Sequence, residues 1–396
     1  MDSGIVDKGT GVCHTITMNI YFDNAASTIV RDEAIETMLR VMREKYGNPS
    51  SMHYAGRRAF GELEKARSSA AGALGTRPEN IYFTSGGTEA NNWAIFGAAG
   101  KLSRNGKHII TSAIEHSAVM DPVKSLESKD WEVTYLPPDS TGIIPAEAFA
   151  AALRDDTVFA SVMLVNNETG AVNPIGDYAN EIKRRGTGTL LHTDAVQGLC
   201  KIPFTVKSLG ADLITVSSHK LHGPKGAGAL YIKDGVKLDP LIIGGGSHER
   251  GQRAGTEALP AIAGFGEAVR LGSSELNETS SAVRELRANL IETLKAGLPE
   301  AVIISDGGSP FILSISLPGY KSEVLMTWLS GEGICVSRSA ACKKGARSRT
   351  LEAMRLRNDV IDGALRVSFS RYNTQEEAEH FVQALKTASE NIIKTR

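Results

Sequence analysis

The sequence predicts an α/β fold, in which an open, mostly parallel sheet is wrapped by helices and followed by a smaller α+β domain. Short apolar runs alternate with helix-like segments through the first two-thirds of the chain, which is typical of a sheet built from strand–helix repeats. Residues 158–165 are apolar except for Ser161, as expected for a parallel strand covered on both faces. The pattern changes after about residue 265, where a long helical segment begins a second group of elements.

The elements can be placed in order along the chain. We expect strands at 81–84, 108–111, 133–136, 158–165, 190–192, 213–216 and 229–232, and helices at 86–100, 117–128, 145–155 and 177–186. In the second part we expect helices at 274–298, 322–331 and 374–394, and strands at 311–317, 334–337 and 365–369. A boundary near 264–272 gives a large domain at 18–265, a small domain at 266–396 and a disordered extension at 1–17.

The composition argues against several classes of protein. The chain has 396 residues, 41% of them hydrophobic, and a net charge of −1, so no overall field favours nucleic acid or a membrane surface. No apolar run reaches the roughly 20 residues of a membrane span, and residues 1–17 lack the apolar core of a signal peptide. The four cysteines form no CxxC pair, so we expect no metal site and a reducing, cytoplasmic setting.

Two polar side chains at the ends of neighbouring strands carry the main chemical hypothesis. Asp194 and Lys220 are 26 residues apart (220 − 194), about one strand-to-strand step in an α/β chain. A lysine amine can form a Schiff base with an aldehyde cofactor, and a buried aspartate can keep a pyridine nitrogen protonated, as pyridoxal phosphate (PLP) chemistry requires. Singly, Asp194 could be a helix cap and Lys220 a surface lysine. Together with His219 and the glycine-rich residues 223–228, they favour a PLP site.

Three further strand ends carry groups that suit such a cofactor. Gly87 and Thr88 lie in a glycine-rich turn before a helix, where free N–H groups bind phosphate, although such a turn is often only a cap. His116 follows another strand and could stack on a planar ring, or it could be an ordinary polar residue. Asn167 lies in a polar cluster that could equally be a simple turn.

Two residues of the second domain are candidates for the chemistry of a substrate. Cys342 has small neighbours and is followed by four cations within seven residues, which would favour its thiolate, although the run could also be a solvated loop or a nucleic-acid patch. Cys335 lies in an apolar strand, where we expect a buried and inert thiol. Arg366 interrupts another apolar strand and could hold a substrate carboxylate or form a structural salt bridge.

Taken together, these motifs resemble those of the cysteine desulfurases, which are fold-type I PLP enzymes of the class V aminotransferase-like group. The resemblance runs from about residue 20 to the C-terminal helix. It rests on the segments YFDNAAST at 21–28, GNPSS at 47–51, TSGGTE at 84–89, EH at 115–116, NNE at 166–168, SHK at 218–220 and RAGT at 253–256, and on the strand of Asp194 and Gln197.

The resemblance implies a role for each candidate. Lys220 would carry PLP and later move protons, Asp194 would pair with the pyridine nitrogen, and His116 would stack on the ring. Gln197 would contact the phenolic oxygen. The phosphate would be held near Gly87 by Thr88, Ser217 and His219, and by Thr256 from the partner of a homodimer. Asn167 and Arg366 would hold the carboxylate of L-cysteine.

The reaction implied converts L-cysteine to L-alanine, with the sulfur passing to Cys342 as a persulfide. That sulfur would go on to an acceptor or scaffold protein, for example in iron–sulfur cluster assembly. The segment SAAC at 339–342 and the basic residues 343–349 depart from the family's usual pattern, which leaves the acceptor open. A selenocysteine lyase, another aminotransferase-like enzyme and a PLP-fold binding or regulatory module are the alternatives.

Overall fold

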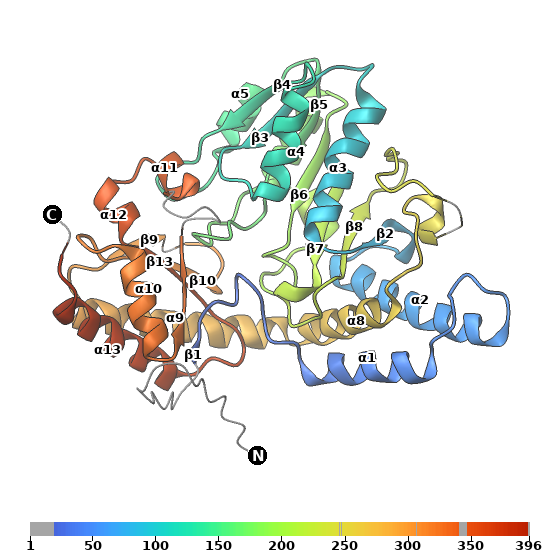
Figure 1. The fold of residues 1–396 in the computed structure, drawn as a ribbon. Coiled ribbons are helices and arrows are strands. Elements are labelled where there is room, and N and C mark those ends of the chain that lie inside the picture. The colour runs from blue at the N-terminus through green and yellow to red at the C-terminus, as the bar shows by residue number, and fades with distance from the viewer. Residues whose placement is uncertain (1–19, 245, 247, 306, 340–346, 395–396) are drawn as a thin grey trace.

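The computed structural model describes residues 20–244, 246, 248–305, 307–339 and 347–394. The expected extension at 1–17 and the candidate Cys342 lie outside these residues. Two groups of elements are visible in Figure 1, each built around its own sheet. Among the described residues, none of the helices is long and apolar enough to cross a membrane.

The large domain is built on a seven-stranded sheet in the order β2-β8-β7-β6-β5-β3-β4. β8 runs antiparallel to both of its neighbours, and the other pairs are parallel. The strands are β2 (Ile81–Thr84), β3 (His108–Ser112), β4 (Glu132–Leu136), β5 (Thr157–Ser161), β6 (Leu190–Asp194), β7 (Leu213–Ser217) and β8 (Gly228–Ile232). The predicted α/β class with a mostly parallel sheet is therefore confirmed.

Helices cover both faces of this sheet, which explains the apolar strands. Consecutive residues point to opposite faces of a strand: Ile109 packs with α3 and α4, whereas Ile110 packs with the helices of the other face. The helices around the sheet are α1 (Asp32–Glu44), α2 (Tyr54–Leu74), α3 (Gly87–Leu102), α4 (Ser117–Glu127), α5 (Ala146–Ala152), α6 (Ile175–Arg185), α7 (Val206–Leu209) and α8 (Leu259–Ser274).

The small domain has a four-stranded antiparallel sheet in the order β12-β13-β10-β9. Its elements are α9 (Leu276–Gly297), β9 (Val302–Ser305), β10 (Ile312–Ser316), α10 (Ser322–Gly331), β11 (Ile334–Cys335), β12 (Ser337–Arg338), α11 (Arg349–Ala353), α12 (Asn358–Asp362), β13 (Ala364–Ser368) and α13 (Gln375–Asn391). The N-terminal strand β1 (Ile20–Tyr21) pairs with β11, so the start of the described chain belongs to the core of this domain.

The chain passes between the two cores at Glu275. α8 ends at Ser274 and contributes to the core beneath the large sheet, whereas α9 begins at Leu276 and contributes to the core of the small domain. This junction lies three residues beyond the range 264–272 that the sequence suggests. Glu275 accepts hydrogen bonds from Arg31 and Arg371, so charged groups of three segments meet there.

Candidate active site

The predicted polar residues gather at one edge of the large sheet. Asp194 is the last residue of β6, and Lys220 ends a short 3₁₀ turn directly after β7. α3 begins at Gly87 just after β2, and His116 caps the start of α4 just after β3. β2, β3, β6 and β7 all run in the same direction, so their carboxyl ends share this edge, where ligands bind in open α/β sheets.

Asp194 is buried, with 6% of its surface exposed, and its carboxylate is held on both oxygens. Oδ1 accepts a hydrogen bond from the backbone N–H of Val196 at 3.0 Å, and Oδ2 accepts one from Nδ2 of Asn91 at 2.7 Å. Asn91 lies on α3, and the sequence analysis did not identify it. A polar residue within the apolar face of that helix is the signal that could have found it.

The Lys220 amine points back onto the N-terminal segment. Its Nζ donates to the carbonyl oxygens of Ala25 and Ala26, both at 2.7 Å. Burial and the positive charge of Arg366 lower the pKa of Lys220 to about 8, while Asp194 opposes the shift. An amine that loses its proton near neutral pH can act both as a nucleophile and as a base.

At the start of α3 the backbone lies very close to neighbouring segments of the chain. A Cβ added at Gly87 would lie 2.9 Å from Cγ2 of Val196, and one added at Gly228 would lie 2.7 Å from Cα of Gly86. Gly86 has a φ of 151°, which an L side chain rarely adopts. Only residues without a side chain therefore fit here. The free N–H groups of the first turn of α3 form a surface suited to an anion.

The other candidates for the phosphate lie around this turn. Thr88 is exposed, Ser217 is buried at the end of β7, and Nδ1 of His219 lies 3.3 Å from Oγ of Ser27. Burial and the nearby Lys220 lower the pKa of His219 to about 4, so its ring is neutral at neutral pH.

His116 presents a neutral ring at the same edge. Its Nδ1 accepts a hydrogen bond from the N–H of Ala118 at 3.1 Å, and desolvation lowers the pKa of the imidazole, against the effect of Asp194. The preceding residue, Glu115, is fully buried, and burial raises its pKa to about 8. Oε1 of Glu115 accepts from Ser112 and from the N–H of Met163. The segment before His116 is therefore fixed to the end of β3 and to the segment that follows β5.

Gln197 connects the sheet edge to a lysine that the sequence analysis missed. Its Nε2 donates to the carbonyl oxygen of Ala25 at 2.8 Å, and its Oε1 accepts from Nζ of Lys201 at 2.8 Å. Lys201 is only 5% exposed. The spacing of four residues between Gln197 and Lys201 was visible in the sequence, but nothing in it indicated that the lysine is buried.

Arg366 reaches the site from the small domain. Its Nη2 donates to Oδ1 of Asp23 at 2.8 Å, and its Nη1 donates to the backbone oxygen of Asn167 at 3.0 Å. Asn167 thus meets Arg366 through its carbonyl group. Nε of Arg366 is buried without a hydrogen-bond partner among the described residues. Both roles weighed for Arg366 stay open: it forms an ion pair with Asp23, and it retains one donor for an added anion.

The segment that contains Thr256 is fastened to the same domain by two ion pairs. Arg253 donates to both carboxylate oxygens of Glu89 at 2.8 and 3.0 Å, and the buried Arg67 donates to both oxygens of Glu249 at 2.8 Å. Thr256 itself is exposed.

Two of the cysteines lie among the described residues. Cys200 is partly buried, and burial raises the pKa of its thiol to about 12. Cys335 was expected to be buried, and this is wrong: the residue is exposed. β11 has only two residues, and because Ile334 faces the core, the next side chain points outward.

The arrangement suits a planar, anionic pyridine aldehyde. It combines an amine, a buried carboxylate, a helix start lined by glycine and an arginine with an unpaired buried donor. PLP would be held by Lys220, Asp194 and the first turn of α3. Among the described residues, no group of three or more His, Cys, Asp or Glu side chains is placed to hold a metal ion.

Comparisons with known proteins agree with this geometry. Residues 20–381 match the model of the family described as aminotransferase class-V. The chain is 41% identical to a protein named cysteine desulfurase IscS from Methanosarcina thermophila, over 92% of this chain and 91% of that relative. A solved structure named NifS-like protein is 38% identical, with a TM-score of 0.90, and covers 95% of this chain and 100% of its own. A structure described as SspA in complex with cysteine is 32% identical, with a TM-score of 0.78, over 90% of this chain and 100% of its own. With this extent of similarity in sequence and fold, the chain belongs to the aminotransferase class-V family.

Proposed function

We propose that the protein is a PLP-dependent cysteine desulfurase that uses Cys342 as the sulfur acceptor. The names of several relatives point to this activity. The observation that carries the proposal is the Lys220 amine directly after β7, at the same sheet edge as the buried Asp194 that ends β6. Burial and Arg366 lower the pKa of this amine to about 8, which suits attack on an aldehyde and proton transfer. PLP, when bound, supplies an electron sink for the carbon next to the substrate's amino group.

The residues of the chain divide the work. The carboxylate of Asp194, held on both oxygens by Val196 and Asn91, would accept a hydrogen bond from a protonated ring nitrogen. Lys220 accepts the α-proton of cysteine and later returns a proton. The thiolate of Cys342 attacks the sulfur of the substrate, so that an S–S bond forms while the C–S bond breaks, and the carbon takes up a proton to give alanine.

Arg366 would orient the substrate. A cysteine carboxylate could accept from the unpaired Nε or replace Asp23 on Nη2, because both are donors at the same guanidinium. In this proposal Asp23 holds the arginine in place until the substrate arrives. Asn167 supports the same arginine through its carbonyl oxygen.

A visible spectrum of the purified protein, followed by addition of L-cysteine, tests the function. We expect a yellow protein whose visible absorption band changes on addition of cysteine, with alanine and persulfide formed in equal amounts before any reductant is added. Brief exposure followed by peptide mass analysis should locate the extra sulfur on Cys342. A colourless protein that does not bind PLP, or a coloured one that leaves cysteine intact, would refute the proposal.

We also propose that the enzyme works as a homodimer. Large apolar side chains are exposed on α1 and around the start of α2, and again in the 241–243 segment: Ile35, Leu39, Met42, Tyr46, Met52, Tyr54, Phe60 and Ile243. Large apolar side chains exposed along neighbouring stretches of the chain favour an interface. Thr256 is exposed and would complete the partner's phosphate site. Analytical sedimentation of the PLP-loaded protein at nanomolar concentration is the test, and an active monomer would contradict it.

A further inference from the structure

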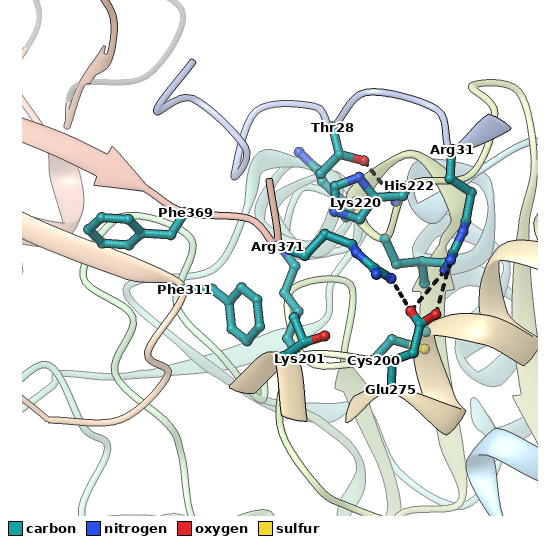
Figure 2. A pocket seen from close by; sticks show the side chains of 13 residues that line it. Thr28, Arg31, Cys200, Lys201, Lys220, His222, Glu275, Phe311, Phe369 and Arg371 are labelled. Atoms are coloured by element: carbon teal, nitrogen blue, oxygen red, sulfur yellow. Dashed lines mark hydrogen bonds and ion pairs between the residues drawn. The ribbon is translucent and has the colours of Figure 1, made fainter. Parts of the chain in front are cut away.

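Two lysines, the buried Lys201 and the partly buried Lys220, share a pocket next to the sheet edge. Lys201 and Lys220 both line it, together with Arg31, Arg371 and Glu275, as Figure 2 shows. Lys220 already has a role in the proposed chemistry, but Lys201 has none. A lysine that is 5% exposed is unusual, because burial of an ammonium group is costly unless the group does specific work.

Lys201 and Lys220 are joined through one side chain and one carbonyl group. Nζ of Lys201 donates to Oε1 of Gln197, and Nε2 of Gln197 donates to the oxygen of Ala25. The same oxygen accepts a hydrogen bond from Nζ of Lys220. A change at Lys201 can therefore reach the amine of Lys220 through a chain of three hydrogen bonds.

The direction of these bonds is fixed by chemistry. The two ends of a glutamine amide differ, since one is an acceptor and the other a double donor, and an ammonium group can only donate. As long as Lys201 is an ammonium group, Oε1 of Gln197 must face it. The NH₂ end is then left for Ala25 and for any acceptor on the cofactor side. Without Lys201, only the carbonyl oxygen of Ala25, which accepts but cannot donate, would hold the amide in this orientation.

The charges around the two amines are mainly positive. Lys201 faces Lys220 and Arg366, and burial with these charges lowers its pKa to about 7, while Cys200 acts in the opposite direction. Lys220 faces Arg366, and Asp194 and Asp23 act in the opposite direction. Lys201 also lowers the pKa of His219 and His222. Removal of one positive charge should therefore favour protons on the remaining groups.

We propose that Lys201 is a positioning residue that holds the carboxamide of Gln197 with its NH₂ group toward the cofactor, so that Gln197 donates a hydrogen bond to an anionic oxygen of bound PLP. The proposal rests on the proposed function, because it assumes that PLP occupies the edge next to Lys220. It adds a residue that does not touch the cofactor.

The test compares Lys201→Met with Lys225→Met in the PLP-loaded full-length enzyme. Both substitutions remove one lysine charge near the site, but Lys225 is exposed and lies on the turn after Lys220. The first measurement is the pH midpoint of the visible absorption change. We expect Lys201→Met to raise it by about 1 pH unit, because Gln197 is held less firmly as a donor to the anionic oxygen and the charge that Lys201 carries below its own pKa is lost. Lys225→Met should leave it within about 0.3 unit, as expected for a screened surface charge.

A second variant distinguishes loss of the hydrogen bond to Gln197 from a general defect in folding. The pocket beside Lys201 leaves space for a larger cation, so Lys201→Arg should keep a donor on Oε1 of Gln197 and restore the midpoint most of the way. Equal midpoints in the wild type and Lys201→Met would overturn the proposal. So would an upward shift of the same size in Lys225→Met or in Lys201→Arg.

A third measurement does not depend on PLP. In the full-length protein without added cofactor, the pH dependence of Lys220 acetylation, followed by peptide mass analysis, reports the protonation of that amine. We expect Lys201→Met to move this midpoint upward and Lys225→Met to leave it in place; an unchanged midpoint in Lys201→Met would count against the inference. If the wild type has no visible band, the proposed function fails, and this measurement still decides whether the two lysines are coupled.

Discussion

The two halves of the site are held in different ways. At the edge of the large sheet, Asp194 and His116 each accept a hydrogen bond from a backbone N–H two residues further on. In the small domain, Arg366 is held by Asp23, which is 343 residues away in the sequence, and Ser348 donates to Glu168, which is 180 residues away. Asp194 and His116 in the cofactor half are thus positioned partly by local structure, whereas the contacts of Arg366 form only when both domains and the N-terminal segment are in place.

The largest effect is expected from a substitution of Lys220 in the cofactor half. Lys220→Ala should reduce desulfuration by more than about 10⁴-fold, because covalent attachment and proton transfer are both lost. The fold should survive, because the side chain lies at the sheet edge and its two partners are backbone carbonyls. Alanine production and the visible spectrum measure the effect, with circular dichroism as the control. Substantial activity in this variant would contradict the assignment of PLP chemistry to Lys220 in the large domain.

Cys342→Ala should separate the two halves. The cofactor half should remain intact, so we expect normal PLP binding and a spectral response to cysteine. Persulfide and alanine formation should nevertheless fall by more than about 10³-fold because the sulfur acceptor is missing. Cys200→Ala and Cys335→Ala are the controls and should retain turnover. Retained desulfuration in Cys342→Ala would mean that the thiol acceptor lies elsewhere.

Arg366→Ala should have a smaller effect that falls mainly on substrate binding. Loss of hydrogen bonds to a carboxylate costs about 1.5–3 kcal/mol, so KM for cysteine should rise by roughly 10- to 150-fold. Asp23→Asn keeps the size of the side chain but removes its charge, and should change KM far less if Asp23 only holds the arginine in place. An unchanged KM in Arg366→Ala would make the contact with Asp23 a purely structural salt bridge.

The same contrast explains how much could be predicted from the sequence. The strands of the large sheet and the residues that end them follow from local apolar patterns, and their parallel order brings Asp194 and Lys220 to one edge. The strand expected at 158–165 ends at Ser161. Val162 and Leu164 still donate to His192 and Asp194 of β6, but the N–H of Met163 between them donates to the side chain of Glu115. Contacts such as Arg366–Asp23 join residues that no local pattern connects.

Two kinds of feature were not predicted, each for a physical reason. Helices α1 and α2 were not assigned, and α1 shows why: Ile35, Leu39 and Met42 are among its exposed residues, so part of its apolar surface does not face the core of its own chain. Lys201 was missed because lysine is ordinarily a surface residue. Its burial depends on α8 and the N-terminal segment closing over the sheet edge.

The smallest expected effect concerns stability and comes from a histidine inside the large sheet. His192 is fully buried between Oγ of Ser161 and Oγ1 of Thr215, and burial lowers its pKa to about 3. Between pH 6.5 and 3 the unfolded chain therefore binds a proton that the folded chain does not. The free energy of unfolding should fall with falling pH in this window, by at most about 1.4 kcal/mol per pH unit from this residue.

Urea unfolding at pH 7, 5 and 4 measures this effect. His192→Gln cannot take up the proton, so its stability should depend less on pH than that of the wild type. The matched control is His380→Gln, which removes an exposed histidine and should retain the wild-type pH dependence. Parallel curves for the wild type and His192→Gln would show that this residue does not contribute to acid sensitivity.

The pairing of β1 with β11 has a consequence for how the protein is made. A ribosome releases residues 20–28 early, but their partners Cys335 and Ser368 emerge only near the end of synthesis. Ala25 and Ala26, which supply the carbonyl partners of Lys220, belong to this early segment. A growing chain that has released only the large domain therefore has the lysine but lacks the strand pairing that anchors the segment around it. We expect the chain to bind the cofactor productively only late in synthesis. In incomplete chains the Lys220 amine would not yet be positioned to react.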